Sequence, residues 1–151
     1  IGTPDPEMRR IASWIFTTVA DDHPCLLAII TALWARSGRE DLKLVGLLLA
    51  NLGGVESVVN PWDIFYELIV GRQSLALEVV LEIAEEMARG GNVVPEDEEL
   101  WNWAKCGKIT HQFAVLVLTL RRDGELPKDL INAAPEGGEL FERIRARLLT
   151  R

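Results

Sequence analysis

The sequence has few of the residues from which recognisable sites are built. Its 151 residues include two cysteines, Cys25 and Cys106, which are too few for a disulfide framework and form no CxxC pair. Only two histidines occur, and no HExxH, GxSxG or GxGxxG motif is present. We therefore expect a reducing, cytoplasmic setting, no cofactor, and none of the catalytic chemistries that these motifs mark.

The sequence also lacks an apolar segment long enough to cross a membrane. Its longest apolar stretches, residues 25–35 and 113–118, fall short of the roughly 18 to 20 residues that a membrane-spanning helix needs. The first ten residues contain no basic head followed by an apolar segment, so we expect no signal peptide. Both observations predict a protein without a membrane partner.

Four residues of the types that bind zinc are present, but their spacing matches no familiar zinc site. His23 and Cys25 are two positions apart, and Cys106 and His111 are five positions apart. Histidines at helix starts and cysteines as small core residues explain the same positions. We expect no metal site.

Acidic residues outnumber basic ones, and the excess lies in the middle of the chain. The net charge is −7; residues 55–104 contain eleven acidic and two basic side chains, whereas residues 105–151 contain six acidic and nine basic ones. Nucleic-acid binding gains most of its affinity by neutralising phosphates, so this balance disfavours a general DNA or RNA binder. A local basic face near the carboxyl end is the one place left for nucleic acid.

The chain is rich in apolar residues, and residues that mark helix starts recur along it at regular intervals. Hydrophobic residues make up 48% and charged residues 26%, the balance of one globular domain, which we expect to span residues 1–151. No segment alternates strictly between apolar and polar residues, so strands are not expected. Pro24, Pro61, Pro95 and Pro127 each precede an apolar periodic run, at intervals of 37, 34 and 32 residues.

Each of these proline-headed segments is interrupted near its middle by a turn signal, which predicts four helical hairpins. The turn signals lie at residues 37–38, 71–74, 107–108 and 135–138. An opening helix over residues 6–19 brings the expected number to roughly eight or nine helices. Helix pairs that repeat at this length are typical of an all-α, right-handed α-α superhelix of the HEAT-like type, and a compact helical bundle is the alternative.

Capping residues predict several helix boundaries. Ser37 and Glu40 have the spacing of a capping box ahead of a helix that ends near Leu52. Ser74 is predicted to cap the next helix, in which an apolar stripe lies opposite a row of glutamates. Residues 109–122 are apolar nearly all round, which predicts a helix packed on both sides.

Residues 60–68, NPWDIFYEL, place a tryptophan beside an aspartate and have two interpretations. Asn60 is a good helix cap, Pro61 suits the first helical position, and Asp63 would meet the positive end of the helix dipole. Trp62 would then anchor the helix against the neighbouring hairpin. Because this explanation accounts for every residue, we prefer it to an aromatic clamp for a base or a peptide.

Three segments resemble a known family of helical-repeat proteins. They are LWARSGREDLKLVGLLLANLGG at residues 33–54, NPWDIFYEL at residues 60–68 and LWNWAKCGKITHQFAVLVLTLRRDGELP at residues 100–127. They are similar to the helix hairpins and the Trp-Asp segment of the HEAT-like alkylpurine DNA glycosylases and their non-catalytic relatives. The resemblance implies the same superhelix of antiparallel helix pairs.

The chain departs from this family at the positions that carry its chemistry. In the active glycosylases a catalytic aspartate follows the tryptophan by four residues, where this chain has Tyr66, and Asp63 is the only carboxylate nearby. The paired arginines that meet the DNA backbone in the family correspond here to His111 and Gln112. The resemblance therefore implies a relative without excision activity.

Two further tryptophans are candidates for binding. Trp101 and Trp103 are two residues apart on one predicted helix and cannot share a face. We expect one of them in the core and the other partly exposed. An exposed tryptophan would be able to anchor a partner, because aromatic residues dominate the energies of interfaces.

A cluster of basic residues lies around the ends of the third predicted hairpin. It consists of Lys105, Lys108, Arg121, Arg122 and Lys128. Solenoids often present ligand-binding loops at such ends, so the cluster is a candidate patch for phosphate or for an acidic partner. The dipole of the preceding helix is a simpler explanation for the two arginines.

We predict a non-catalytic helical-repeat module that binds a protein or peptide through one face of the superhelix. A DNA-lesion-binding or DNA glycosylase-like protein is the alternative from a different class, with Trp62 and Asp63 at the lesion and the basic cluster on phosphates. Tyr66 is a further candidate binding residue. A subunit that assembles with copies of itself is the second alternative.

Overall fold

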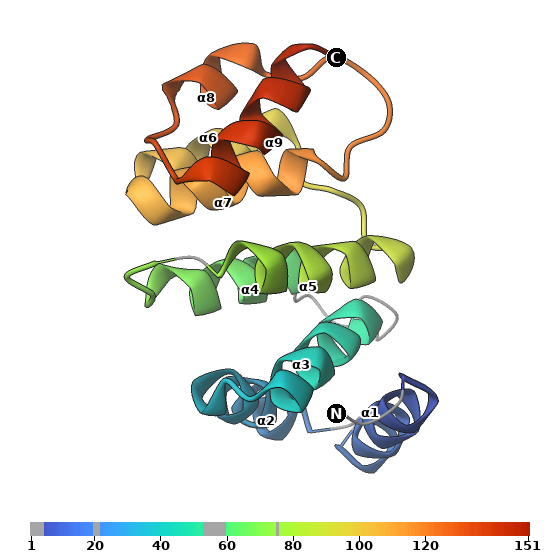
Figure 1. Ribbon diagram of the computed structural model, residues 1–151. Coiled ribbons are helices and arrows are strands. Elements are labelled where there is room, and N and C mark those ends of the chain that lie inside the picture. The colour runs from blue at the N-terminus through green and yellow to red at the C-terminus, as the bar shows by residue number, and fades with distance from the viewer. Residues whose placement is uncertain (1–4, 20–21, 53–59, 75) are drawn as a thin grey trace.

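The computed structural model describes residues 5–19, 22–52, 60–74 and 76–151, and within these ranges it contains nine α-helices and no strand. The helices are α1 Asp5–Val19, α2 His23–Arg36, α3 Arg39–Leu52, α4 Pro61–Val70, α5 Leu77–Arg89, α6 Asp97–Lys105, α7 Lys108–Leu118, α8 Lys128–Ala133 and α9 Glu139–Leu149. Figure 1 shows α1 to α3 at one end of the molecule, α4 and α5 in the middle, and α6 to α9 at the other end. The all-α prediction is confirmed. None of the described helices is both long and apolar enough to span a bilayer.

The start of α4 confirms the interpretation of NPWDIFYEL as a helix beginning. The Asn60 side chain accepts a hydrogen bond of 3.0 Å from the backbone N–H of Trp62. Pro61 occupies the first helical position, and Asp63 lies in the first turn, where a negative charge faces the positive end of the dipole. Local sequence alone therefore fixes where this helix begins.

Two predicted helix caps are wrong. Ser37 ends α2 in a left-handed conformation, with its N–H donating to the Leu33 carbonyl and its hydroxyl to the Trp34 carbonyl, so it does not cap α3. Asp41 instead accepts a hydrogen bond from the N–H of Gly38, directly before α3. Ser74 lies outside α5, which begins at Leu77 without a side-chain cap.

Three of the four predicted hairpins form as pairs, and the second does not. In the described residues α2 packs on α3, α6 on α7 and α8 on α9, but α5 packs mainly along α3 rather than against α4. Gly46 lies at this contact, and a Cβ there would lie 3.5 Å from the Ile83 Cα. A side-chain methyl at this position would therefore make an ordinary van der Waals contact with α5. The regular superhelix thus stays a prediction.

The segment α7 is the most buried helix, as its apolar sequence predicts. Every residue from position 110 to position 118 is buried, and the helix packs against α4, α5, α6 and α9. It ends at Leu118, before the predicted position 122. The N–H groups of Thr119, Leu120 and Arg121 each bond to the carbonyl three residues earlier, which tightens the chain into a turn.

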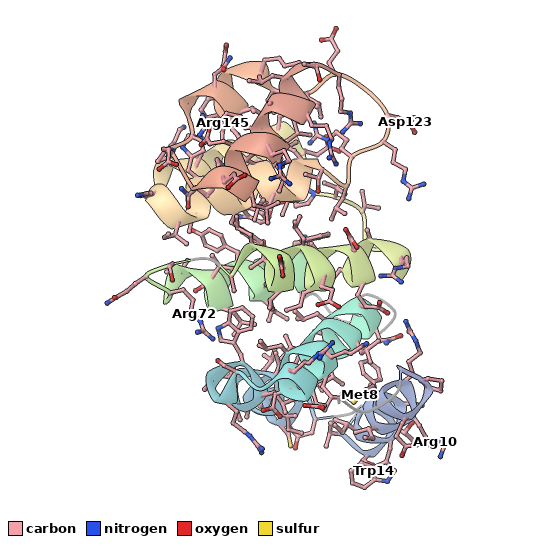
Figure 2. All side chains as sticks on the ribbon, viewed as in Figure 1. Met8, Arg10, Trp14, Arg72, Asp123 and Arg145 are labelled. Carbon is pink, nitrogen blue, oxygen red and sulfur yellow. The ribbon has the colours of Figure 1, made fainter. Side chains whose placement is uncertain are left out.

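Arg72 connects the end of α4 to the end of α2. Its guanidinium lies 4.6 Å from the centroid of the Trp34 ring and donates to the Trp34 carbonyl and the Ser37 hydroxyl, at 3.0 and 3.1 Å. Figure 2 shows Arg72 on the side of its layer that faces α2. A single planar cation therefore joins two layers of helices by stacking and hydrogen bonding together.

We expect Gly90→Ala to lower the free energy of unfolding by about 1–3 kcal/mol, because a Cβ there would lie 2.8 Å from the Ala50 carbonyl oxygen, a backbone atom. That oxygen also accepts a hydrogen bond from Asn92, which a shift would disturb. Gly71→Ala is the matched control: both glycines follow a helix with nearly equal φ, −74° and −78°. A Cβ at Gly71 would meet no described atom within 4 Å. Urea unfolding of both variants tests this, and equal stabilities would contradict it.

Candidate functional site

Three residues predicted as site residues meet at a seam between α4 and α6. Asp63 forms a side-chain hydrogen bond with Glu99, and the Tyr66 ring stacks on Trp103 with centroids 5.2 Å apart. The Tyr66 hydroxyl is also hydrogen bonded to Cys106. The seam therefore combines two carboxyl groups, a phenol and a thiol, of which sequence reasoning had singled out Asp63 and Tyr66.

Burial and the neighbouring Asp63 favour the protonated form of Glu99 in the seam. The pKa of Glu99 is raised from 4.5 to about 7, first by burial and then by the hydrogen bond with Asp63 and by the negative charge of Asp63. Burial, the hydrogen bond to Cys106 and the charges of Cys106 and Glu67 raise the pKa of Tyr66 to about 12. Protonated Glu99 donates to Asp63, so each group satisfies the other.

Two of the predicted binding tryptophans belong to the core instead. Trp62 is 1% exposed and Trp103 is 4% exposed, so neither ring can meet a partner. Trp101 is half-buried, which confirms the expectation that one of the pair Trp101 and Trp103 is core and the other partly exposed. The Trp62 indole N–H is buried without a hydrogen-bond partner in the described part of the chain.

The predicted basic cluster does not form one open patch. Arg121 bonds to the Asp97 carboxylate and, at 2.9 Å, to the Pro95 carbonyl, and Lys128 bonds to the carbonyls of Leu148 and Arg151. These two cations hold loops and helix ends in place. Lys105, Lys108 and Arg122 are exposed. Arg122 lines a separate hollow of about 620 Å³ next to the ends of α5 and α7.

His111 and Gln112 have structural roles at the positions where the resembled family meets DNA. Both are buried, and the His111 Nε2 lies 2.8 Å from the Leu130 carbonyl oxygen. The Gln112 side chain donates to the carbonyls of Pro135 and Glu136. These side chains tie α7 to α8 and to the loop before α9, and they are not available to bind a phosphate.

A groove between α1, α3 and α5 is the feature that the sequence analysis missed. This three-helix groove encloses about 190 Å³. Its apolar lining consists of Leu42, Gly46, Leu47, Val79 and Ile83. Its charged lining consists of Arg9, Arg39, Lys43, Glu82, Glu86 and Arg89. Four cations from three different helices thus meet two carboxylates above an apolar surface.

Part of this charge is already engaged within the groove. Glu86 forms ion pairs with Arg9 at 3.0 Å and with Arg89 at 3.4 Å. The Arg39 side chain, in contrast, has no hydrogen-bond or ion-pair partner among the described residues. On α5, Glu82, Glu86 and Arg89 are four and three residues apart, and this spacing in the sequence predicts that they share one exposed face of the helix. The spacing does not predict that α1 and α3 pack beside this face of α5.

No three His, Cys, Asp or Glu side chains of the described residues gather as a metal ion would require, and both cysteines are free thiols. Comparisons of the chain with family models, with curated proteins and with solved structures found no match.

Ionisation of Glu99 is expected to make stability depend on pH. The folded state keeps the Glu99 proton up to about pH 7, whereas the unfolded chain loses it near pH 4.5, so the folded state binds more protons between these values. The free energy of unfolding therefore falls as pH rises through this window. Glu99→Gln keeps a neutral donor toward Asp63 and should be more stable than wild type at about pH 8, by on the order of 1 kcal/mol for this partly solvated pair. Near pH 4, below the pKa of Glu99 in the unfolded chain, the difference between the two proteins should largely disappear. This is the lower of the two pH values to be compared.

Glu98→Gln is the control for this measurement. It removes the same charge from the same first turn of α6, but Glu98 is exposed. Urea unfolding at both pH values gives the comparison. A stability difference between Glu99→Gln and wild type that does not change with pH would contradict the raised pKa of Glu99.

Proposed function

We propose that the chain is a non-catalytic helical module that binds a segment of another protein in the three-helix groove. The observation that supports this most strongly is the composition of the groove, in which an apolar lining is surrounded by charges of both signs. Protein-binding surfaces combine an apolar centre with a polar rim in the same way. A groove between packed helices also accommodates an extended or helical peptide.

The seam between α4 and α6 supports catalysis less well than the groove supports binding. Asp63 and Glu99 satisfy each other, and Tyr66 is engaged by Trp103 and Cys106. None of the three hollows described for this chain is lined by Asp63 or Glu99. A pair of carboxyl groups needs a substrate within hydrogen-bond reach to act as acid and base.

Binding to DNA lesions is the alternative, and the contacts favour it less. It would need Trp62 at the lesion, but this ring is buried, and it would need Arg121 on phosphate, but this side chain is held by Asp97. The net charge of −7 adds a general repulsion between the protein and a nucleic acid. Lys105, Lys108 and Arg122 are the cations of the predicted cluster that stay exposed.

Selection of displayed peptides on the intact chain tests the proposal. We expect enriched peptides that bind saturably with one-to-one stoichiometry in calorimetry. Val79→Lys should weaken them by about tenfold or more, because it places a charged side chain in the apolar lining. Val70→Lys is the matched control, because Val70 is 50% exposed on α4 and lines none of the three hollows. Circular dichroism verifies that both variants are folded.

Two results would overturn this proposal. One is the absence of any enriched peptide, and the other is equal binding by Val79→Lys and wild type. A labelled duplex with an abasic site is titrated in parallel by fluorescence anisotropy. Saturable binding that exceeds binding to the intact duplex and weakens with salt would support the DNA alternative instead.

A further inference from the structure

We infer that the peptide bound in the three-helix groove is acidic and inserts an apolar side chain next to its carboxylates. The inference rests on the proposed function and adds the chemical class of the partner. It follows from the charge of the groove, from the position of Arg39 and from the size of the apolar lining.

The charged lining of the groove is positive although the chain is acidic. Four cations face two carboxylates there, whereas the whole chain has a net charge of −7. Glu86, one of the two carboxylates, is already bound by Arg9 and Arg89. A local excess of positive charge on an acidic protein attracts a negatively charged partner and repels a basic one.

Arg39 has a position that the stability of its own helix does not explain. It is the first residue of α3, where the positive end of the helix dipole makes a cation unfavourable. Its guanidinium has no hydrogen-bond or ion-pair partner among the described residues, and it lines the groove. A guanidinium can bind a carboxylate through two parallel hydrogen bonds. Arg39 is therefore the residue that we assign to the partner's carboxylate.

The apolar lining of the groove indicates which other side chains the bound peptide carries beside its carboxylate. Leu47 and Ile83 are buried, Leu42 and Val79 are half-buried, and Gly46 contributes no side chain. The enclosed volume of about 190 Å³ is smaller than the roughly 300–1,000 Å³ of pockets for drug-sized ligands. It suits one or two aliphatic side chains of a peptide. A nucleic-acid backbone has no aliphatic side chains and would leave this lining unfilled.

Fluorescein-labelled hexapeptides test the inference by fluorescence anisotropy at low ionic strength. The acidic peptide EELLEE should bind wild type more tightly than the charge-reversed KKLLKK and than EESSEE, which lacks the apolar side chains. Arg39→Glu should weaken the binding of EELLEE by about tenfold or more, since it removes a charge-assisted contact and adds a repulsive charge. It should also improve the binding of KKLLKK.

Arg10→Glu is the matched control variant. It makes the same charge change on the outer side of α1, away from α3, as Figure 2 shows, and its side chain is 77% exposed. We expect it to bind EELLEE within about twofold of wild type, since charges that touch no ligand act mainly through weak, salt-screened interactions. Arg39→Glu should fold normally, because the helix dipole favours a carboxylate at this first position.

The possible results separate this inference from the proposed function. Equal binding of EELLEE by Arg39→Glu and Arg10→Glu, or tighter binding of KKLLKK by wild type, would overturn the acidic partner. The proposed function would still stand if displayed peptides are enriched and are weakened by Val79→Lys. Displacement of EELLEE by duplex DNA, with no effect of replacing its leucines, would overturn the inference in favour of a general anion site.

Discussion

The burial of Phe113 between Phe65 and Trp103 is the contact on which the arrangement of α4, α6 and α7 depends. The Phe113 ring is fully buried, meets the Phe65 ring edge-on at 4.9 Å and stacks on Trp103 at 5.2 Å. The contacts continue from Phe65 to Trp34 and from Trp103 to Tyr66, so that one series of rings extends from α2 to the seam. Aromatic pairs have preferred geometries as well as large buried areas, so this series fixes both the spacing and the orientation of the helices.

The seam between α4 and α6 depends on these packed rings, whereas the three-helix groove depends on other contacts. Asp63 and Glu99 lie close together where the stacked rings of Tyr66 and Trp103 hold α4 beside α6. The burial of Glu99 in this packing is the main cause of its raised pKa. The groove depends instead on the packing of α5 and of α1 against α3. Its charged side chains lie outside the core, so they can change with little effect on the fold.

The basic side chains show that residues close in sequence need not form one binding site. Arg121 and Lys128 are close in sequence to Lys105 and Lys108, and together they predicted one basic patch. The structure uses Arg121 and Lys128 to satisfy backbone carbonyls at loops and helix ends, where an arginine or lysine supplies several donors at once. Arg9, Arg39 and Arg89 are far apart in sequence but line a single groove. No local pattern connects them, because their convergence is produced by the packing of three helices.

Four features could be predicted from the local order of residues: the helical class, the start of α4 at Pro61, the doubly packed segment α7 and the division of Trp101 and Trp103 between surface and core. Each of these depends on interactions within a few residues or on the period of the helix, which are written in the local order of residues. Three others could not: α5 packs along α3, Ser37 ends one helix instead of starting the next, and the pKa of Glu99 is raised beside Asp63. These outcomes depend on distances between residues far apart in the chain and on the burial that follows from them, neither of which a local pattern contains.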